Sequence, residues 1–136
     1  MQINTRQELM REYATRASAC GLRVDVPSDG VFNGEIAIVA EAPGEHEMRM
    51  RLPLVGGSGK YLWDTLKKYN LSRQNTYVTN VVKRQVSLSA KVHDDKIPVG
   101  KDELVHWESL LRWELSQLPN LKFILVLGNF SLNAIT

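Results

Sequence analysis

Hydrophobic residues along this chain follow two spacings, which predict helices and buried strands in alternation. Apolar side chains recur at helical spacing over residues 5–19, 58–69 and 101–118. Short runs rich in apolar, β-branched and aromatic residues, typical of strands in a parallel sheet, occupy residues 35–40, 75–82 and 123–127. A last helix begins near Phe130. The predicted order is therefore αβαβαβα.

The predicted helices have apolar faces and recognisable ends. Thr5 or Asn4 can cap the first helix, and Gly21 follows its last turn. Pro119-Asn120 ends the third helix. The side chains expected on the buried faces are Leu9, Tyr13 and Arg16 or Ala17 in the first helix, Tyr61, Leu62, Thr65, Leu66 and Tyr69 in the second, and Leu104, Trp107, Leu111 and Leu115 in the third.

This alternation predicts an α/β fold of three layers (α/β/α), in which helices cover both faces of a central parallel sheet. The 136 residues suit one domain. Sheets of this kind bind ligands at the carboxyl ends of their strands, near a switch in strand order. The loops that leave those ends follow Ala40, Asn80 and Leu127. We therefore expect the functional site at these loops.

Composition says more about the cellular compartment of the protein than about its function. The net charge of +2 is far below that of a basic nucleic-acid-binding tail. Basic residues cluster at 48–51 and 83–84, as either a phosphate-facing patch or a solvated surface. No apolar run approaches the ~20 residues of a membrane span, and residues 1–6 lack the apolar core of a signal peptide, so we do not expect secretion. Cys20, the single cysteine, cannot form an internal disulfide, so we expect a cytoplasmic protein away from membranes.

The loop after residue 40 is the most informative segment. It contains Glu41-Ala42-Pro43-Gly44-Glu45 and, further on, Pro53-Leu54-Val55-Gly56-Gly57-Ser58-Gly59. Glycines allow a ligand to approach the backbone closely, and Gly56 opens a helix whose N–H groups can bind an anion. Taken alone, such a loop also fits a generic nucleotide-binding domain. That alternative ranks last, because the chain has neither a phosphate-loop lysine motif nor a Gly-x-Gly-x-x-Gly turn.

Taken together, three segments resemble the family 4 uracil-DNA glycosylases. Glu-Ala-Pro-Gly-Glu spans 41–45, Pro-Leu-Val-Gly-x-Ser-Gly spans 53–59, and Tyr-Val-Thr-Asn-Val-Val-Lys spans 77–83. The likeness continues to Leu-Gly at 127–128 and reaches from about residue 17 to residue 136. The resemblance implies this fold class and an enzyme that flips uracil out of DNA and cleaves its glycosidic bond. Its implied partner is single-stranded or uracil-containing DNA.

The resemblance also implies roles for individual residues. Glu41 matches an acidic position that would place water or stabilise the sugar cation; otherwise it caps a helix or pairs with Arg49 or Arg51. Asn80 matches the uracil-reading asparagine, whose amide offers a donor and an acceptor; otherwise it satisfies local backbone. The further implied positions are Ala42, Pro43, Gly44 and Leu54 for the substrate, and Gly56, Ser58, Gly59, Arg49, Arg51 and Lys83 for DNA phosphates.

The chain departs from the family pattern at several of these positions. Leu54 stands where the family has a phenylalanine that stacks on uracil, so base binding is expected to be weaker. The family holds an iron–sulfur cluster with four cysteines. Here only Cys20 is present, and the other matched positions are Ala17, Arg84 and His106. One thiolate cannot hold a cluster, so we predict no cofactor and no metal.

A fourth strand and a His-Pro-Ser motif complete the family pattern and have no counterpart before Thr136. We therefore expect residues 1–136 to form one glycosylase-like domain that lacks its last strand. The exposed edge of the third strand would then permit a homodimer. His93 lies in the long loop of residues 83–100. One glycosylase subclass has a covalently acting histidine in this region; a solvated loop histidine is the simpler interpretation.

Two functions remain open at this point. In the first, the chain is a uracil-DNA glycosylase of DNA repair or replication, a hydrolase that uses Glu41 and Asn80. In the second, it is a non-catalytic module that binds DNA or docks replication proteins. Glycosylase-like domains of that kind stand at the N-terminus of some phage family A DNA polymerases. The cytoplasm of a bacterium or of a virus-infected host cell suits both.

Overall fold

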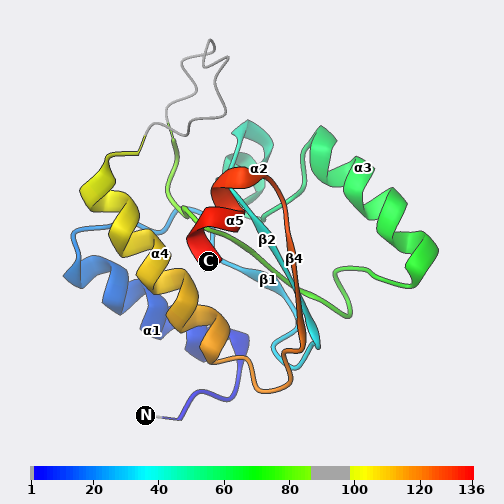
Figure 1. Ribbon diagram of the computed structural model, residues 1–136, viewed down its shortest axis with the longest axis horizontal. Coiled ribbons are helices and arrows are strands. Elements are labelled where there is room, and N and C mark those ends of the chain that lie inside the picture. Colours follow the sequence, from blue (N-terminus) through cyan, green and yellow to red (C-terminus); the bar gives the residue numbers. More distant parts are fainter. Residues whose placement is uncertain (1, 87–98) are drawn as a thin grey trace.

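The computed structural model describes residues 2–86 and 99–136. Its elements are α1 (Arg6–Ala19), β1 (Asp29–Gly30), β2 (Ile36–Ala40), α2 (Glu45–Met50), α3 (Gly57–Leu66), the short 3-10 helix η1 (Lys67–Tyr69), β3 (Tyr77–Asn80), α4 (Lys101–Ser116), β4 (Phe123–Val126) and α5 (Asn129–Ile135). The sheet lies between α1 and α4 on one side and α3 on the other (Figure 1). The predicted α/β fold of three layers is confirmed.

The sheet has the strand order β1-β3-β2-β4. Strand β2 is flanked by parallel partners on both sides, so that Ile38 pairs with Val78 of β3 and with Leu125 of β4. The strand order therefore switches at β2, which is where ligands bind in such sheets. The three predicted strands do pair in parallel, and β1 extends the sheet by pairing antiparallel with β3. Two residues carry no periodic pattern, so β1 was not predicted.

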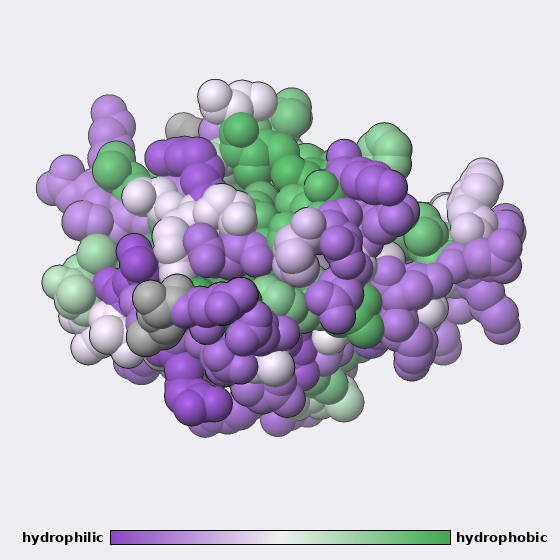
Figure 2. All heavy atoms as spheres, turned by 90° about the horizontal axis from the view of Figure 1, so that it is seen from below, coloured by the Kyte–Doolittle hydropathy of each residue, from purple (hydrophilic) through white to green (hydrophobic). Residues whose placement is uncertain are grey.

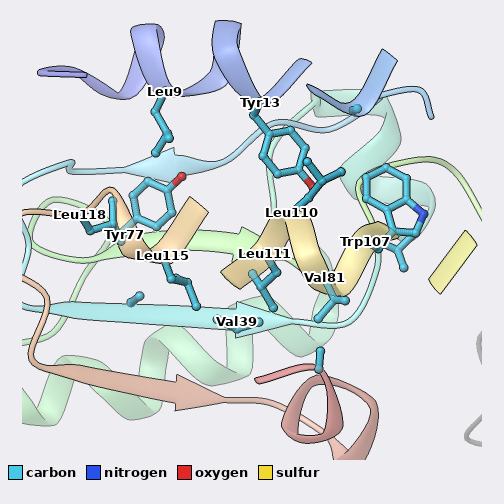
Figure 3. Packing of buried hydrophobic residues seen from close by; sticks show 14 of the residues in the cluster. Leu9, Tyr13, Val39, Tyr77, Val81, Trp107, Leu110, Leu111, Leu115 and Leu118 are labelled. Atoms are coloured by element: carbon cyan, nitrogen blue, oxygen red, sulfur yellow. The ribbon is translucent and has the colours of Figure 1, made fainter. Parts of the chain in front are cut away.

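Most of the hydrophobic core lies between the sheet and the helices α1 and α4. Figure 3 shows Leu9 and Tyr13 reaching from α1 towards the sheet. The other main contributors are Ala17 of α1, Ala37 and Val39 of β2, Tyr77 of β3, and Trp107, Leu110, Leu111 and Leu115 of α4. Successive strand residues point to opposite faces, so the buried side chains of Ile38 and Val78 lie on the α3 side.

Both predicted ends of α1 are confirmed. The Thr5 hydroxyl oxygen accepts a hydrogen bond from the backbone N–H of Glu8 at 3.1 Å. At the other end Gly21 adopts φ +74°, and the N–H of Leu22 donates to the carbonyl of Ala17 at 2.8 Å. These caps fix the ends of α1, whose buried side chains Leu9, Tyr13 and Ala17 pack in the core.

The apolar face predicted for the second helix is partly wrong. Tyr61 is 76% exposed and Tyr69 is 70% exposed, whereas α3 buries Gly59 and Leu66. Compared with the predicted face, α3 is turned so that Gly59, which has no side chain, packs against the backbone of Leu54 in the preceding loop. That loop also contains a short helix, α2, which was not predicted.

The third parallel strand is less buried than predicted. Phe123 of β4 is 65% exposed and Ile124 is 38% exposed. Within the described residues β4 pairs with β2 alone, so it forms an edge of the sheet. The surface seen from below is mostly hydrophilic, with a hydrophobic area across its upper part (Figure 2).

The structure also bears on the predicted absence of a membrane span and on the predicted long loop. In the described part of the chain, no helix is long and apolar enough to cross a membrane. Most of the long loop predicted over residues 83–100, including His93, lies outside the described residues.

Candidate functional site

A cleft of about 470 Å³ opens at the carboxyl ends of the three parallel strands. Glu41 follows β2, Asn80 ends β3, and Gly128 follows β4, and all three line this cleft. The starts of α2 and α3 contribute further walls. The structure thus brings together the three loops that the strand pattern singled out.

Most of the predicted site residues meet in this cleft. Those that line it are Glu41, Ala42, Gly44, Leu54, Gly56, Ser58, Gly59 and Asn80. Pro43 is buried behind the loop, while Arg49 and Arg51 are exposed side chains at the end of α2. Arg49 pairs with Glu45 of its own helix at 3.3 Å. The two arginines therefore remain candidates for contacts outside the cleft.

The carboxylate of Glu47 ties two walls of the cleft together. It accepts hydrogen bonds from the backbone N–H groups of Gly44 at 2.9 Å, Val55 at 2.9 Å and Gly56 at 2.6 Å. Partial burial acts to raise the pKa of Glu47, but the bonds from Gly56, Val55 and Gly44 outweigh burial and lower it. Because the N–H of Gly56 already donates to Glu47, a DNA phosphate at this group would have to compete with that carboxylate.

The turn that carries Leu54 is held from two directions. Leu54 has φ +55°, a conformation that is uncommon for a residue with a side chain. Trp63 donates its indole N–H to the Leu54 carbonyl at 3.1 Å. Arg73 donates to the same carbonyl and to that of Pro53, stacks over Trp63 at 5.0 Å, and pairs with Asp29 at 2.9 Å. These contacts fix the backbone of Leu54, which lines the cleft.

Asn80 lies at the floor of the cleft and is 3% exposed. Among the described residues its side-chain Nδ2 has no hydrogen-bond partner. Most buried amide donors in proteins do have a partner, and an unmade bond costs about 1–3 kcal/mol. Asn80 therefore brings an unused amide donor to the lining of the cleft.

Lys83 does not reach the surface, so its predicted contact with a DNA phosphate is corrected. Its side chain is 0% exposed, and its Nζ pairs with Glu114 at 2.9 Å and donates to the Asn80 carbonyl at 2.6 Å. Burial lowers the pKa of the Lys83 ammonium, and the charge of Glu114 opposes that shift. The motif lysine points inward because α4 covers the end of β3 with an acidic partner.

The positions matched to the cluster cysteines do not fit a four-thiolate site. Ala17 is buried in the core, and Cys20 and His106 are exposed. Arg84 is engaged by Glu103, with Nε and Oε2 2.6 Å apart. Over the described ranges, no three Cys, His, Asp or Glu side chains are grouped to hold a metal. The prediction that the chain carries no cluster remains a prediction.

Several cleft residues were not predicted. Glu45, His46 and Glu47 line it from α2, and Leu127 and Gly128 line it from the turn after β4. The signals were present: α2 directly follows the motif at 41–45, and Leu-Gly at 127–128 stands at a strand end. The hydrogen bonds of Glu47 could not have been read from spacing, because they depend on how the loop folds back.

Comparisons with known proteins agree with this geometry. The family model of the Uracil DNA glycosylase superfamily matches residues 27–136. A type-4 uracil-DNA glycosylase of Archaeoglobus fulgidus is 33% identical over 106 residues, which cover 78% of this chain and 49% of that protein. One from Thermotoga maritima is 35% identical over 86 residues, covering 58% and 45%. The chain spans about half the length of these relatives. It belongs to the uracil-DNA glycosylase superfamily.

Proposed function

We propose that this chain recognises uracil in DNA and takes part in its excision, as a hydrolase of DNA repair. The observation that carries the proposal is Asn80 Nδ2, which has no hydrogen-bond partner within residues 2–86 and 99–136, in a cleft that Glu41 also lines. Uracil presents an acceptor, O4, beside a donor, N3–H. An asparagine amide offers the complementary pair.

The reaction breaks the bond between C1′ of the sugar and N1 of uracil. The bonding electrons leave with the base, water adds to C1′ of the sugar, and the proton that this water loses neutralises the departing uracil anion. The role we assign to Glu41 is to stabilise the positive charge on the sugar or to orient that water. Arg49 and Arg51, exposed beside the cleft, are the candidates for phosphate contacts, together with the N–H groups of Ser58 and Gly59.

The test is uracil release from a single-stranded, uracil-containing oligonucleotide. We expect release by the parent chain and a loss of about 100-fold or more in Asn80→Ala, because a base-stabilising contact is removed. Asn133→Ala, on the exposed side of α5, is the matched control and should behave like the parent. Absence of release by the parent chain would overturn the catalytic proposal.

A second function, a non-catalytic module that binds DNA or docks replication proteins, is favoured by Leu54. Its side chain lines the cleft without a π-face, and stacking on an aromatic contributes about 1–3 kcal/mol per base. Such a module would suit the N-terminal part of a phage polymerase. In this case Arg49→Glu with Arg51→Glu should weaken DNA binding in a chain that releases no uracil. Lys83 and Arg84 are unsuitable for this test because both are held in ion pairs.

A homodimer through β4 is a further proposal about partners. The strand is an edge within the described residues, and it exposes Phe123 and Ile124. Sedimentation of the parent chain and of Ile124→Lys tests it. A parent that sediments as a monomer would exclude the dimer.

A further inference from the structure

A pair of opposite charges is completely buried beneath the end of β3. Lys83 and Glu114 are both 0% exposed, and their Nζ and Oε1 atoms are 2.9 Å apart. Removing two charges from water costs more than most buried pairs recover, and an apolar pair of similar size is often at least as stable. The stability of the fold is therefore a weak explanation for this pair.

Neighbouring side chains contact both charged groups of this pair. Glu114 Oε2 accepts hydrogen bonds from the hydroxyls of Tyr77 at 2.6 Å and Thr79 at 2.8 Å. The ammonium of Lys83 lies 4.6 Å from the centre of the Tyr13 ring, which supports the positive charge from α1. These contacts leave both charged groups with a single defined geometry.

One contact of the pair leads directly to the cleft. Lys83 Nζ donates to the backbone carbonyl of Asn80 at 2.6 Å. Thr79 points to the α4 face of the sheet, where it meets Glu114, and the next side chain, Asn80, points the other way. The carbonyl of Asn80 thus connects the buried charges on one face with the amide on the other.

We propose that Lys83, oriented by Glu114, is a positioning residue that fixes Asn80 for base recognition. Holding the carbonyl fixes the backbone at the end of β3, and backbone geometry decides which side-chain rotamers Asn80 can adopt. The amide then keeps one orientation at the cleft although its Nδ2 has no partner among the described residues. This inference rests on the proposed role of Asn80 in reading the base.

The test removes both charges at once, in the double variant Lys83→Met with Glu114→Gln. Neither charge is left unpaired, and the glutamine retains an acceptor for Tyr77 and Thr79. The first readout is the side-chain amide signal of Asn80 in a nitrogen–proton correlation spectrum, assigned by its loss in Asn80→Ala. The second is kcat and KM for uracil release. We expect the Asn80 signal to move and kcat/KM to fall by about 10- to 100-fold.

Leu115→Ala is the control for a merely structural effect. It weakens the core from the same helix, one residue beyond Glu114, and Leu115 makes no hydrogen bond to Lys83 or Asn80 through its side chain. Its Asn80 signal should stay in place while the chain is folded. An unmoved Asn80 signal in the folded double variant, or an equal movement in Leu115→Ala, would overturn the inference.

A second double variant is used if the first one does not fold. Lys83→Gln with Glu114→Gln keeps an amide donor near the Asn80 carbonyl and should displace the Asn80 signal less than loss of the donor does. The spectrum does not depend on turnover. A parent chain without activity would therefore refute the proposed function, whereas an unmoved signal would refute only the positioning role.

Discussion

The carboxylate of Glu41 lies against the α-carbon of Gly128, so closely that a β-carbon there would come 2.7 Å from Glu41 Oε1. Gly128 also has φ +85° and ψ 158°, a conformation essentially restricted to glycine. The two residues follow β2 and β4, which are neighbours in the sheet. The position of the proposed catalytic carboxylate therefore depends on the absence of a side chain on the adjacent loop.

Gly128→Ala should displace Glu41 and lower uracil release by about tenfold or more, since small misplacements of reacting groups are costly. Gly21→Ala is the matched control. It also introduces a side chain at positive φ, +74°, but its β-carbon would meet nothing within 4 Å. Activity per folded molecule should fall only in the first variant. Equal activity in the two would show that Glu41 is not placed by this contact.

Gly59 and Gly57 form a second matched pair, at the start of α3. A β-carbon at Gly59 would lie 2.3 Å from the Leu54 carbonyl oxygen, whereas one at Gly57 would meet nothing within 4 Å. We expect Gly59→Ala to lower the free energy of unfolding by about 1–3 kcal/mol through overpacking. Gly57→Ala should be neutral or stabilise by about 0.4–1 kcal/mol. Urea unfolding measures both, and a neutral Gly59→Ala would contradict the tight contact.

The lowered pKa of Glu47 should make the free energy of unfolding depend on pH. Its folded pKa lies below the ordinary value of 4.5, so the ionised form is favoured by folding. The stabilisation is complete above about pH 4.5 and is lost as the pH falls through the folded pKa. Glu47→Gln should therefore be less stable than the parent at neutral pH, with a difference that shrinks on acidification. Urea unfolding from about pH 7 to pH 3 tests this, and a constant difference would argue against it.

Replacing Leu54 by an aromatic residue should increase the affinity of the chain for uracil-containing DNA. Leu54→Phe supplies a π-face to a base in the cleft and should tighten binding of a uracil-containing single strand by about tenfold. Leu54→Ala removes the apolar contact and should weaken it. Fluorescence anisotropy measures all three chains. Weaker binding by Leu54→Phe than by the parent would show that the base does not lie against this side chain.

Much of the fold followed from local patterns in the sequence. The faces of α1 and α4 could be predicted because helical spacing alone puts Leu9, Tyr13 and Ala17, or Trp107 and Leu111, on one side. The cleft could be placed because the ends of parallel strands meet at one edge of a sheet. Leu54 and Asn80 were identified through motif resemblance, and the structure brings both to that edge.

The partners of the polar residues were decided only by the tertiary structure. Lys83 was expected at the surface beside other basic residues, and it is instead paired with Glu114, 31 positions away in the chain. Glu47 had no predicted role, yet it joins two cleft walls. Periodicity tells which face of an element is apolar, because that depends on backbone geometry. It cannot tell which distant charge or carbonyl a polar side chain meets, because packing between separate elements determines that.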